Sequence, residues 1–479
     1  MAKSLLQKLK EYDNTMLPMH MPGHKRNLAL SGENGYLAAL CADCDITEIA
    51  GFDNLAEPED LLLSVKERAA ALWQSEDSYL LVNGSTGGLL ASIYATVPYG
   101  GTVLTARNCH KSVYHGLQLV NATTVYLLPE EDEETGTCGV LTPEAVESAL
   151  RAHGEAKLVI VTSPTYEGVL SDVEGICRVA HAYGVPVLVD SAHGAHLGFG
   201  DFPKSAVEYG ADLVVQSLHK TMPCLTQTAL LHRNGTLLSA EAVQAAIQLF
   251  QTSSPSYLLL ASIEGCIGLL EERGEELFAA WNEALKEFYK AARMLQRIKV
   301  VGAEEADGET RDKESLVRDK SKIIIRTRGT GLTGAELMER LRSEYQIELE
   351  MAAEQYGLAM TGMGDTKGSL ARLLKALFEI DAECGKGAER KLVYPVLPKG
   401  RKRAAEALAA PAKEYGLKES VGKIVGEYVW AYPPGIPLLV PGEEISEELV
   451  RFLSQKEAYG VRIHRTSGKG GETIRCICE

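Results

Sequence analysis

The sequence predicts an α/β fold in which a mostly parallel β-sheet is covered by helices on both faces. Between Ser78 and about Leu237, short runs rich in valine, leucine and isoleucine alternate with amphipathic stretches of helical spacing. Such apolar runs are typical of parallel strands, because both faces of these strands are buried. The runs that we expect to form them are Tyr79–Val82, Thr102–Thr105, Thr123–Leu128, Leu158–Thr162, Val185–Asp190 and Leu213–Ser217.

One further strand and two helices frame this sheet. The run Thr228–His232 follows the last parallel strand after a gap too short for a crossover helix, so we expect it to be antiparallel. Leu61–Gln74 has the pattern of a helix that precedes the sheet. The stretch from Glu264 to about Val300 predicts a long helix that connects two domains.

The chain is predicted to divide into four parts. Residues 1–55 form an N-terminal arm, and residues 56–300 form the large domain that contains the sheet. Residues 301–390 form a smaller α/β domain, and residues 391–479 form a C-terminal domain. The small domain is predicted from strands at Ile323–Arg326 and Gly357–Met360, and from helices at Thr333–Tyr345 and 365–382.

A charged stretch opens the small domain. The residues from Glu304 to Lys322 are rich in acidic and basic side chains and poor in apolar ones. A solvated loop is the interpretation that this composition favours.

Composition excludes several classes of function. The net charge of −16 argues against nucleic-acid or anionic-membrane binding as the main task. No apolar run reaches the ~18 residues that span a bilayer, and the N-terminus lacks a signal-peptide core. The ten cysteines are scattered, as in a reducing compartment, and neither Cys41-x-x-Cys44 nor Cys476-x-Cys478 has a second ligand pair at zinc spacing. We therefore expect a cytoplasmic protein without a metal site.

Polar side chains follow five of the predicted strands. In open sheets of parallel strands, ligands bind at the carboxyl ends of the strands. Five polar clusters that converge on one edge favour a binding site there more strongly than any one of them does. These clusters are Asn83-Gly84-Ser85, Arg107-Asn108-Cys109-His110, Ser163-Pro164-Thr165, Asp190 and Ser217–Lys220.

Lys220 and Asp190 together predict a site for pyridoxal phosphate. Asp190 ends one apolar run, and Lys220 follows the next one about thirty residues later. In such a site a lysine amine forms a Schiff base with the cofactor, and a carboxylate keeps the ring nitrogen protonated. Alone, the lysine would more often be a surface residue, and the aspartate would equally well be a turn cap. The pair favours the cofactor site.

A phosphate group would be held at the beginning of a helix. Gly84, Ser85 and Thr86 lie between a predicted strand and a predicted helix, where backbone amides and hydroxyls suit a dianion. Ser217 and His219 are expected to contact phosphate or substrate. The motif lacks the Walker lysine and the spacing GxGxxG, so nucleotide binding is disfavoured.

Other residues are predicted to contact the ring or the phosphate. Ala192 is small enough to lie against one ring face, and His110 could stack on the other, although a helix-capping or core histidine is the alternative. Thr252 and Ser254 belong to a hydroxyl-rich turn that could supply a second phosphate contact across a dimer interface. As a bare motif, such a turn is more often only a turn.

With these residues assembled, the chain resembles the fold-type-I Orn/Lys/Arg decarboxylase family over most of its length. The motifs occur in the order of the family, and together they are highly specific. They are Pro22-Gly23-His24-Lys25, Asp53-Asn54-Leu55, Arg107–Ser112, Asp190-x-Ala192-His193-Gly194-Ala195-His196, Ser217-x-His219-Lys220, Tyr432–Pro437 and Pro441-Gly442-Glu443.

The resemblance implies a role for each matching residue. Lys220 is the Schiff-base lysine, Asp190 the partner of the pyridine nitrogen and His110 the stacking imidazole. Glu443 is a candidate for binding the distal cation of the substrate, with a surface glutamate as the equal alternative. The cofactor contacts predicted in total are Gly84, Ser85, Thr86, His110, Asp190, Ala192, His193, Ser217, His219, Lys220, Thr252 and Ser254.

The chain departs from the family pattern in three places. It begins almost directly at the Pro-Gly-His-Lys arm, without the N-terminal wing domain of the large inducible bacterial members. We therefore expect a homodimer or a dimer of dimers rather than a ring-shaped assembly. Ser191 replaces the usual glutamate after the ring-binding aspartate, and Glu167 stands where a second tyrosine is common, so arginine, lysine and ornithine stay open as substrates.

The function implied is decarboxylation of arginine, lysine or ornithine to the corresponding amine, in polyamine metabolism. An aminotransferase on the same fold is the first alternative, because Arg372 is available as a clamp for the substrate carboxylate. A regulatory paralogue without activity is the second. That alternative is disfavoured because Lys220 and Asp190 are both present.

Overall fold

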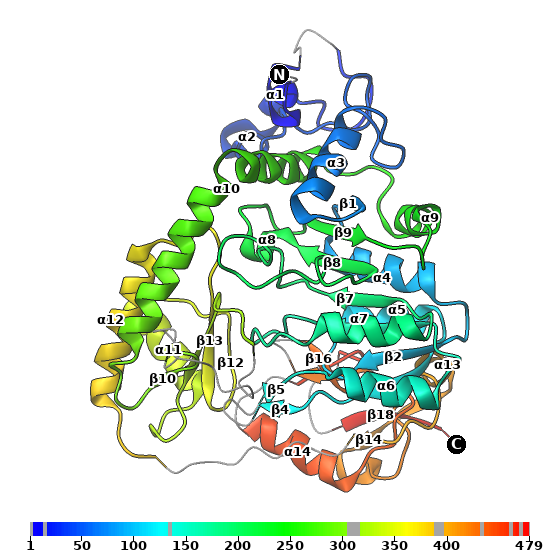
Figure 1. The fold of residues 1–479 in the computed structure, drawn as a ribbon, viewed down its shortest axis with the longest axis vertical. Helices are drawn as coiled ribbons and strands as arrows, with labels where there is room; N and C mark the ends of the chain where they lie inside the picture. The colour runs from blue at the N-terminus through cyan, green and yellow to red at the C-terminus, as the bar shows by residue number, and fades with distance from the viewer. Residues whose placement is uncertain are drawn as a thin grey trace.

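A seven-stranded sheet forms the centre of the large domain, as the computed structural model of the chain shows (Figure 1). The structure describes residues 3–12, 17–132, 137–303, 317–387, 397–431, 435–458, 463–468 and 473–478. In spatial order, the strands are β1 (Asp77–Leu81), β9 (Ala229–Arg233), β8 (Leu213–Ser217), β7 (Val187–Asp190), β6 (Leu158–Thr162), β2 (Thr102–Ala106) and β3 (Thr123–Leu127).

The strand directions confirm the predicted fold class. The strands from β8 to β3 pair in parallel, whereas β9 pairs antiparallel with both β8 and β1. β1 therefore points the same way as β8, and its carboxyl end lies at the shared edge. Val187, rather than Val185, begins β7, and it directly follows Pro186, which has no N–H to donate to a ladder.

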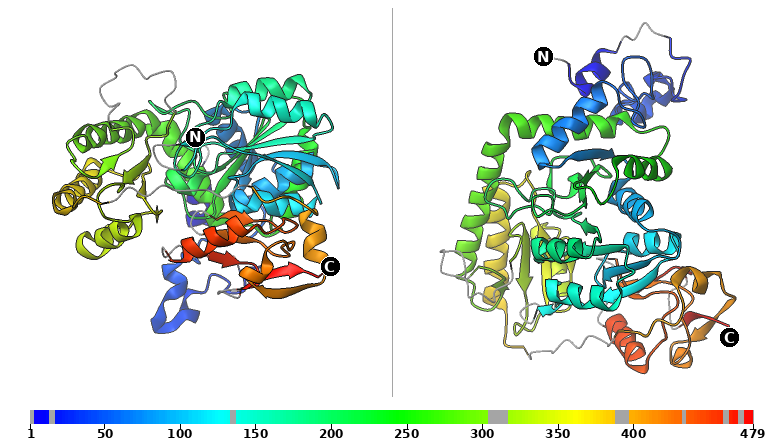
Figure 2. Two further views of the ribbon diagram at one scale, coloured as in Figure 1. Left: turned by 90° about the horizontal axis from the view of Figure 1, so that it is seen from below. Right: turned by 45° about the vertical axis from the view of Figure 1, so that its right-hand side comes forward.

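Helices cover both faces of this sheet (Figure 2). α4 (Gly84–Thr96) packs with α5 (Lys111–Leu119) and α9 (Ala240–Phe250) on one face, while α6 (Pro143–Ala152) and α7 (Val173–Ala182) pack together on the other. α4 approaches the sheet closely at Gly88. A Cβ atom there would lie 2.6 Å from Leu81 Cδ1 and 3.0 Å from Val215 Cγ1, so any side chain would push the helix away.

A long helix connects the large domain to the small one. α10 (Tyr257–Ala292) runs from the N-terminal segments to the small domain, where it packs against α12 (Figure 1). It ends at Ala292, before the predicted Val300, and Lys299–Val300 forms a strand, β10. The remaining elements of the small domain are β11 (Lys322–Arg326), α11 (Gly334–Tyr345), β12 (Met351–Ala352), β13 (Tyr356–Met360) and α12 (Lys367–Glu383).

The C-terminal domain lies beside the β2–β3 end of the large sheet (Figure 2). Its strands form one two-stranded and one three-stranded sheet. Its elements are α13 (Ala404–Ala409), β14 (Ala412–Gly416), the 3-10 turn η2 (Lys418–Ser420), β15 (Val429–Ala431), β16 (Ile436–Leu439), α14 (Glu447–Ala458), β17 (Ile463–Arg465) and β18 (Thr473–Ile477).

Short segments complete the chain. None of the described helices combines the length and the apolar composition that crossing a bilayer requires.

The domain boundaries drawn from the sequence stay predictions. The remaining elements are α1 (Leu5–Glu11), η1 (Leu28–Asn34), α2 (Tyr36–Ala39), α3 (Leu61–Trp73), β4 (Glu131–Asp132), β5 (Thr137–Cys138) and α8 (Leu218–Thr221).

Candidate active site

The predicted lysine and aspartate come together at the carboxyl edge of the sheet. Asp190 ends β7, and Lys220 lies in the short helix α8 that follows the neighbouring strand β8. The two groups are close enough that each shifts the pKa of the other toward its charged form. Adjacent parallel strands thus bring together two residues that are thirty positions apart in the chain.

Asp190 is a buried carboxylate that lacks a full counter-charge. It is 3% exposed and accepts a hydrogen bond from the backbone N–H of Ala192 at 3.2 Å. Burial raises its pKa, and Lys220 and the Ala192 amide offset only part of that effect. A cationic ring nitrogen would supply the missing charge.

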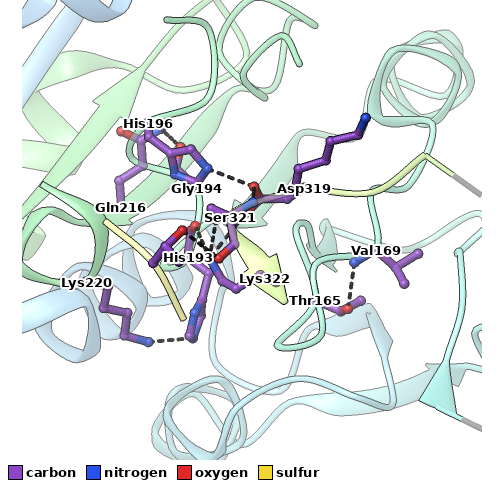
Figure 3. A network of polar contacts seen from close by, with 12 residues as sticks. Thr165, Val169, His193, Gly194, His196, Gln216, Lys220, Asp319, Ser321 and Lys322 are labelled. Atoms are coloured by element: carbon purple, nitrogen blue, oxygen red, sulfur yellow. Dashed lines mark hydrogen bonds and ion pairs between the residues drawn. The ribbon is translucent and has the colours of Figure 1, made fainter. Parts of the chain in front are cut away.

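The amine of Lys220 shares a hydrogen bond of 2.8 Å with Nε2 of His193 (Figure 3). Burial lowers the pKa of Lys220, Asp190 raises it, and Lys322 lowers it further. Burial also holds the pKa of His193 well below its usual range, with Lys220 and Lys322 adding to the effect. A neutral imidazole therefore orients an amine that releases its proton more readily than a surface lysine.

His110 lies at the same edge and caps a helix. It precedes α5, and its Nδ1 accepts a hydrogen bond from the backbone N–H of Ser112 at 3.3 Å. Burial lowers its pKa to about 4, with Lys220 as the next cause. The capping role that was the alternative is thus present, and it fixes the ring orientation. Stacking on a cofactor ring stays a prediction.

Two hydroxyls meet where the phosphate is predicted. The side chains of Ser85, in the first turn of α4, and Ser217, at the end of β8, form a hydrogen bond. His219 hydrogen-bonds through Nδ1 to the Thr228 carbonyl at 2.8 Å, which leaves Nε2 for another partner. Gly84 adopts a φ of +68°, which favours glycine, but its N–H donates to the Gln227 carbonyl.

These residues fit pyridoxal phosphate. An amine with a lowered pKa lies beside a buried carboxylate, and a pair of hydroxyls lies near the start of a helix, as the aldehyde, ring nitrogen and phosphate require. The buried Nδ1 of His193 has no hydrogen-bond partner among the described residues, so it can still bind a ligand. No group of three metal-binding side chains lies together in the described part of the chain.

A buried ionic network from the small domain supports His193, and the sequence did not predict it. Lys322 Nζ lies 3.2 Å from the carboxylate of Asp319, 3.0 Å from the Ser321 hydroxyl and 3.5 Å from the carbonyl of His193 (Figure 3). Asp319 also pairs with His196 at 3.0 Å. The side chains of Lys322, Asp319 and His196 are fully buried.

The solvated loop predicted for Glu304–Lys322 is therefore wrong at its described end. Residues 304–316 lie outside the described residues, but Asp319 and Lys322 are buried where the small domain meets the large one. The charged composition indicated exposure to solvent, but Asp319 and Lys322 are buried because they pair with each other and Asp319 pairs with His196. The spacing of Asp319 and Lys322 permits their pairing, but it does not indicate burial, because the histidine that packs with them lies more than a hundred residues upstream.

Replacing Lys322 with methionine is expected to destabilise the protein by about 3–5 kcal/mol, because the carboxylate of Asp319 would lose a buried cationic partner. Urea-induced unfolding measures this loss. Lys320→Met is the control, since Lys320 is exposed two residues away and should change stability by less than about 0.5 kcal/mol. Equal losses of stability in the two variants would contradict a stabilising role for the buried pair of Lys322 and Asp319.

Glu443 lies at the same edge, but its carboxylate already has a partner. The side chain is 2% exposed, lies 3.4 Å from the guanidinium of Arg107 and accepts the Val440 N–H at 2.7 Å. Arg107 also donates to the carbonyl of Pro437 at 2.7 Å. The pair joins the C-terminal domain to the end of β2. The predicted contact of Glu443 with substrate stays a prediction that this geometry does not favour.

The turn that contains Thr252 and Ser254 lies next to the N-terminal segment. Thr252 lines a cavity with Glu48 and Asn54 of the N-terminal segment, and its hydroxyl accepts the Ser254 N–H. No described contact joins these residues to the Lys220 site. Tyr432, Pro433 and Pro434 of the C-terminal motif lie outside the described residues.

Solved structures identify the class of the fold. The chain superposes on the lysine decarboxylase of Francisella novicida with a TM-score of 0.81 and 20% identity, over 99% of this chain and 81% of the other. The constitutive lysine decarboxylase of Escherichia coli gives a TM-score of 0.79 at 21% identity, over 98% and 80%. The fold is that of fold-type-I enzymes that use pyridoxal phosphate.

The chain belongs to the Orn/Lys/Arg decarboxylase family. The model of the major domain of that family matches residues 3–339, and the model of its C-terminal domain matches residues 393–463. An arginine decarboxylase of Bacillus subtilis is 30% identical over 96% of this chain and 94% of its own length. An arginine decarboxylase of Halalkalibacterium halodurans is 32% identical over the same shares. The protein is an amino-acid decarboxylase.

Proposed function

We propose that the protein decarboxylates a basic L-amino acid (arginine, lysine or ornithine) with pyridoxal phosphate bound at Lys220, in polyamine metabolism. The observation that carries this proposal is the contact of the Lys220 amine with His193 beside the buried Asp190. The names of the relatives, arginine and lysine decarboxylases, support a basic substrate.

Each residue has a defined task in this proposal. Bound pyridoxal phosphate accepts the electron pair that the substrate Cα retains when carbon dioxide leaves. Lys220 would bind the cofactor covalently, and its lowered pKa favours the free amine. Asp190 holds positive charge at the ring nitrogen. Ser85, Ser217 and His219 hold the phosphate end.

The aminotransferase alternative requires Arg372 to bind the carboxylate of the substrate, but in the structure Arg372 binds backbone carbonyls instead. The guanidinium of Arg372 lies on the exposed face of α12 and donates to the carbonyls of Tyr345 and Gln346, at 2.5 and 3.1 Å. These contacts bind it to the end of α11. Its availability as a carboxylate clamp, on which this alternative depended, is thereby reduced.

A substrate panel tests the proposed function. The purified protein, loaded with pyridoxal phosphate, is incubated with arginine, lysine and ornithine, and carbon dioxide and product mass are measured. We expect stoichiometric amine and carbon dioxide from one of the three. Keto-acid formation without carbon dioxide would favour the aminotransferase, and no reaction with any of them would contradict the proposal.

We further propose that the active unit is a homodimer, or a dimer of dimers, in which the Thr252–Ser254 turn serves the site of the partner. No described contact joins this turn to Lys220 of its own chain, and Thr252 lines a cavity with the N-terminal segment instead, which supports the proposal. Mixing a Lys220→Ala protein with a Thr252→Ala, Ser254→Ala protein should restore activity in the mixed dimers. Two inactive variants that never complement would contradict it.

A further inference from the structure

Glu350 brings an exposed carboxylate of the small domain to the Lys220 site. It directly precedes β12, and its side chain is exposed, whereas its neighbours Leu349 and Met351 are both 5% exposed. Burial and Asp190 have the largest effects on the pKa of Lys220, but the charge of Glu350 also raises that pKa. Glu350 therefore lies within electrostatic range of the amine.

A short chain of contacts places Glu350 relative to Lys220. Its carboxylate accepts a hydrogen bond from the hydroxyl of Tyr166. The Tyr166 ring packs against the His193 ring, with centroids 4.7 Å apart and planes at 62°. His193 in turn holds the amine of Lys220. Tyr166 and His193 thus separate the carboxylate of Glu350 from the amine of Lys220. The carboxylate belongs to the small domain.

The other carboxylates around the site are already committed. Asp190 is buried and serves the ring nitrogen in the proposed function. Glu443 is paired with Arg107. Glu167 is 9% exposed and accepts a hydrogen bond from the hydroxyl of Tyr356 at 3.0 Å. Glu350 is the carboxylate in this set that remains accessible to an incoming cation.

A basic amino acid needs such a group. Its α-amino group reacts where the Lys220 amine lies, so its distal cation must come to rest several bonds away. A cation that leaves water requires a carboxylate partner, and a guanidinium or ammonium pairs best with one that is already oriented. The Tyr166 hydroxyl holds one oxygen of Glu350 and leaves the other for a ligand.

We propose that Glu350, oriented by Tyr166, binds the distal cationic group of the substrate, an assignment that rests on the proposed function. The small domain then supplies substrate selection, while the edge of the large sheet supplies the chemistry. Glu350 is a specificity residue in this arrangement, and Tyr166 is a positioning residue that acts through it.

Glu350→Gln tests the proposal, because it removes the charge and keeps the size. Kinetics are compared between the basic substrate and a neutral analogue of similar length, such as norleucine for lysine or citrulline for arginine. We expect kcat/KM for the basic substrate to fall about 10- to 100-fold, mainly through KM, with little change for the analogue. Calorimetric affinity for the product amine should fall in parallel.

Three further variants define the controls. Glu348→Gln removes an exposed carboxylate two positions away, which pairs with Arg342 at 3.2 Å, and it should change nothing. Tyr166→Phe should produce a smaller loss of the same kind. Glu350→Asp keeps the charge and should keep most of the discrimination, which separates the effect of charge from any defect in folding.

The outcomes separate this inference from the proposed function. If the unaltered protein forms no amine from arginine, lysine or ornithine, the proposed function fails. If it does form an amine, and Glu350→Gln keeps both the preference for the basic substrate and the affinity for the amine, the assignment of Glu350 alone is overturned.

Discussion

Lys220→Ala is expected to abolish turnover, with a loss of about 10⁴- to 10⁶-fold, as for other enzymes that lose a covalent nucleophile. The visible absorbance of the lysine-bound cofactor should disappear with it. The structure offers no replacement in the described residues around the site. Lys322, whose charge also reaches this site, is buried and tied to Asp319 and Ser321.

The measurement combines activity with chemical labelling. Borohydride reduction of the loaded protein should fix the cofactor mass on the peptide that contains Lys220, and the variant should remain unlabelled. Lys111→Ala is the control: Lys111 begins α5 at the same strand edge, but its amine lies 5.4 Å from the Trp430 ring. A label on any other lysine, or activity retained in Lys220→Ala, would refute the assignment.

The sheet could be predicted from the sequence because a strand buried on both faces appears as a continuous apolar run. β6 and β8 coincide with the predicted runs, and the short gap before β9 correctly indicated an antiparallel strand. The edge that carries Asp190 and Lys220 followed from the same argument, since parallel strands end together.

What the sequence could not predict depends on contacts between domains. Glu443 is buried against the distant Arg107, and the local pair of Lys322 and Asp319 is buried against His193 and His196 of the large domain. Glu350, in contrast, is a charged residue that stays exposed. The alternation around Leu349 and Met351 indicates that its side chain faces away from the small-domain core, but only the packing of the domains brings it to Tyr166.

Asp190→Asn is expected to lower kcat by about 1,000-fold, because the amide cannot hold positive charge at the ring nitrogen. The substitution preserves size, so the cofactor should still bind and its absorbance should remain visible. Steady-state rates, measured at equal cofactor occupancy, give the loss. A variant with normal kcat would remove Asp190 from the proposed mechanism.

The same substitution is expected to stabilise the protein without cofactor. Burial raises the folded-state pKa of Asp190 above its unfolded value, so the ionised carboxylate makes folding less favourable as pH rises toward neutrality. Asparagine carries no such charge. Urea unfolding of cofactor-free protein at pH 7 should therefore show a higher free energy for the variant. The difference should shrink as pH falls toward about 3.9, where an ordinary aspartate takes up its proton.

Asp212→Asn provides the matched control, with the opposite effect on stability and no effect on turnover. Asp212 is 2% exposed and directly precedes β8, at the opposite end of the strand from Ser217. Its carboxylate pairs with His181 at 2.7 Å and accepts the Val187 N–H at 2.8 Å. Its substitution should lower stability and leave kcat nearly unchanged. If Asp190 lowers the stability of the cofactor-free protein but is needed for turnover, its role is to bind the cofactor and not to stabilise the fold. If the two variants behaved alike, the carboxylate of Asp190 would have only a structural role.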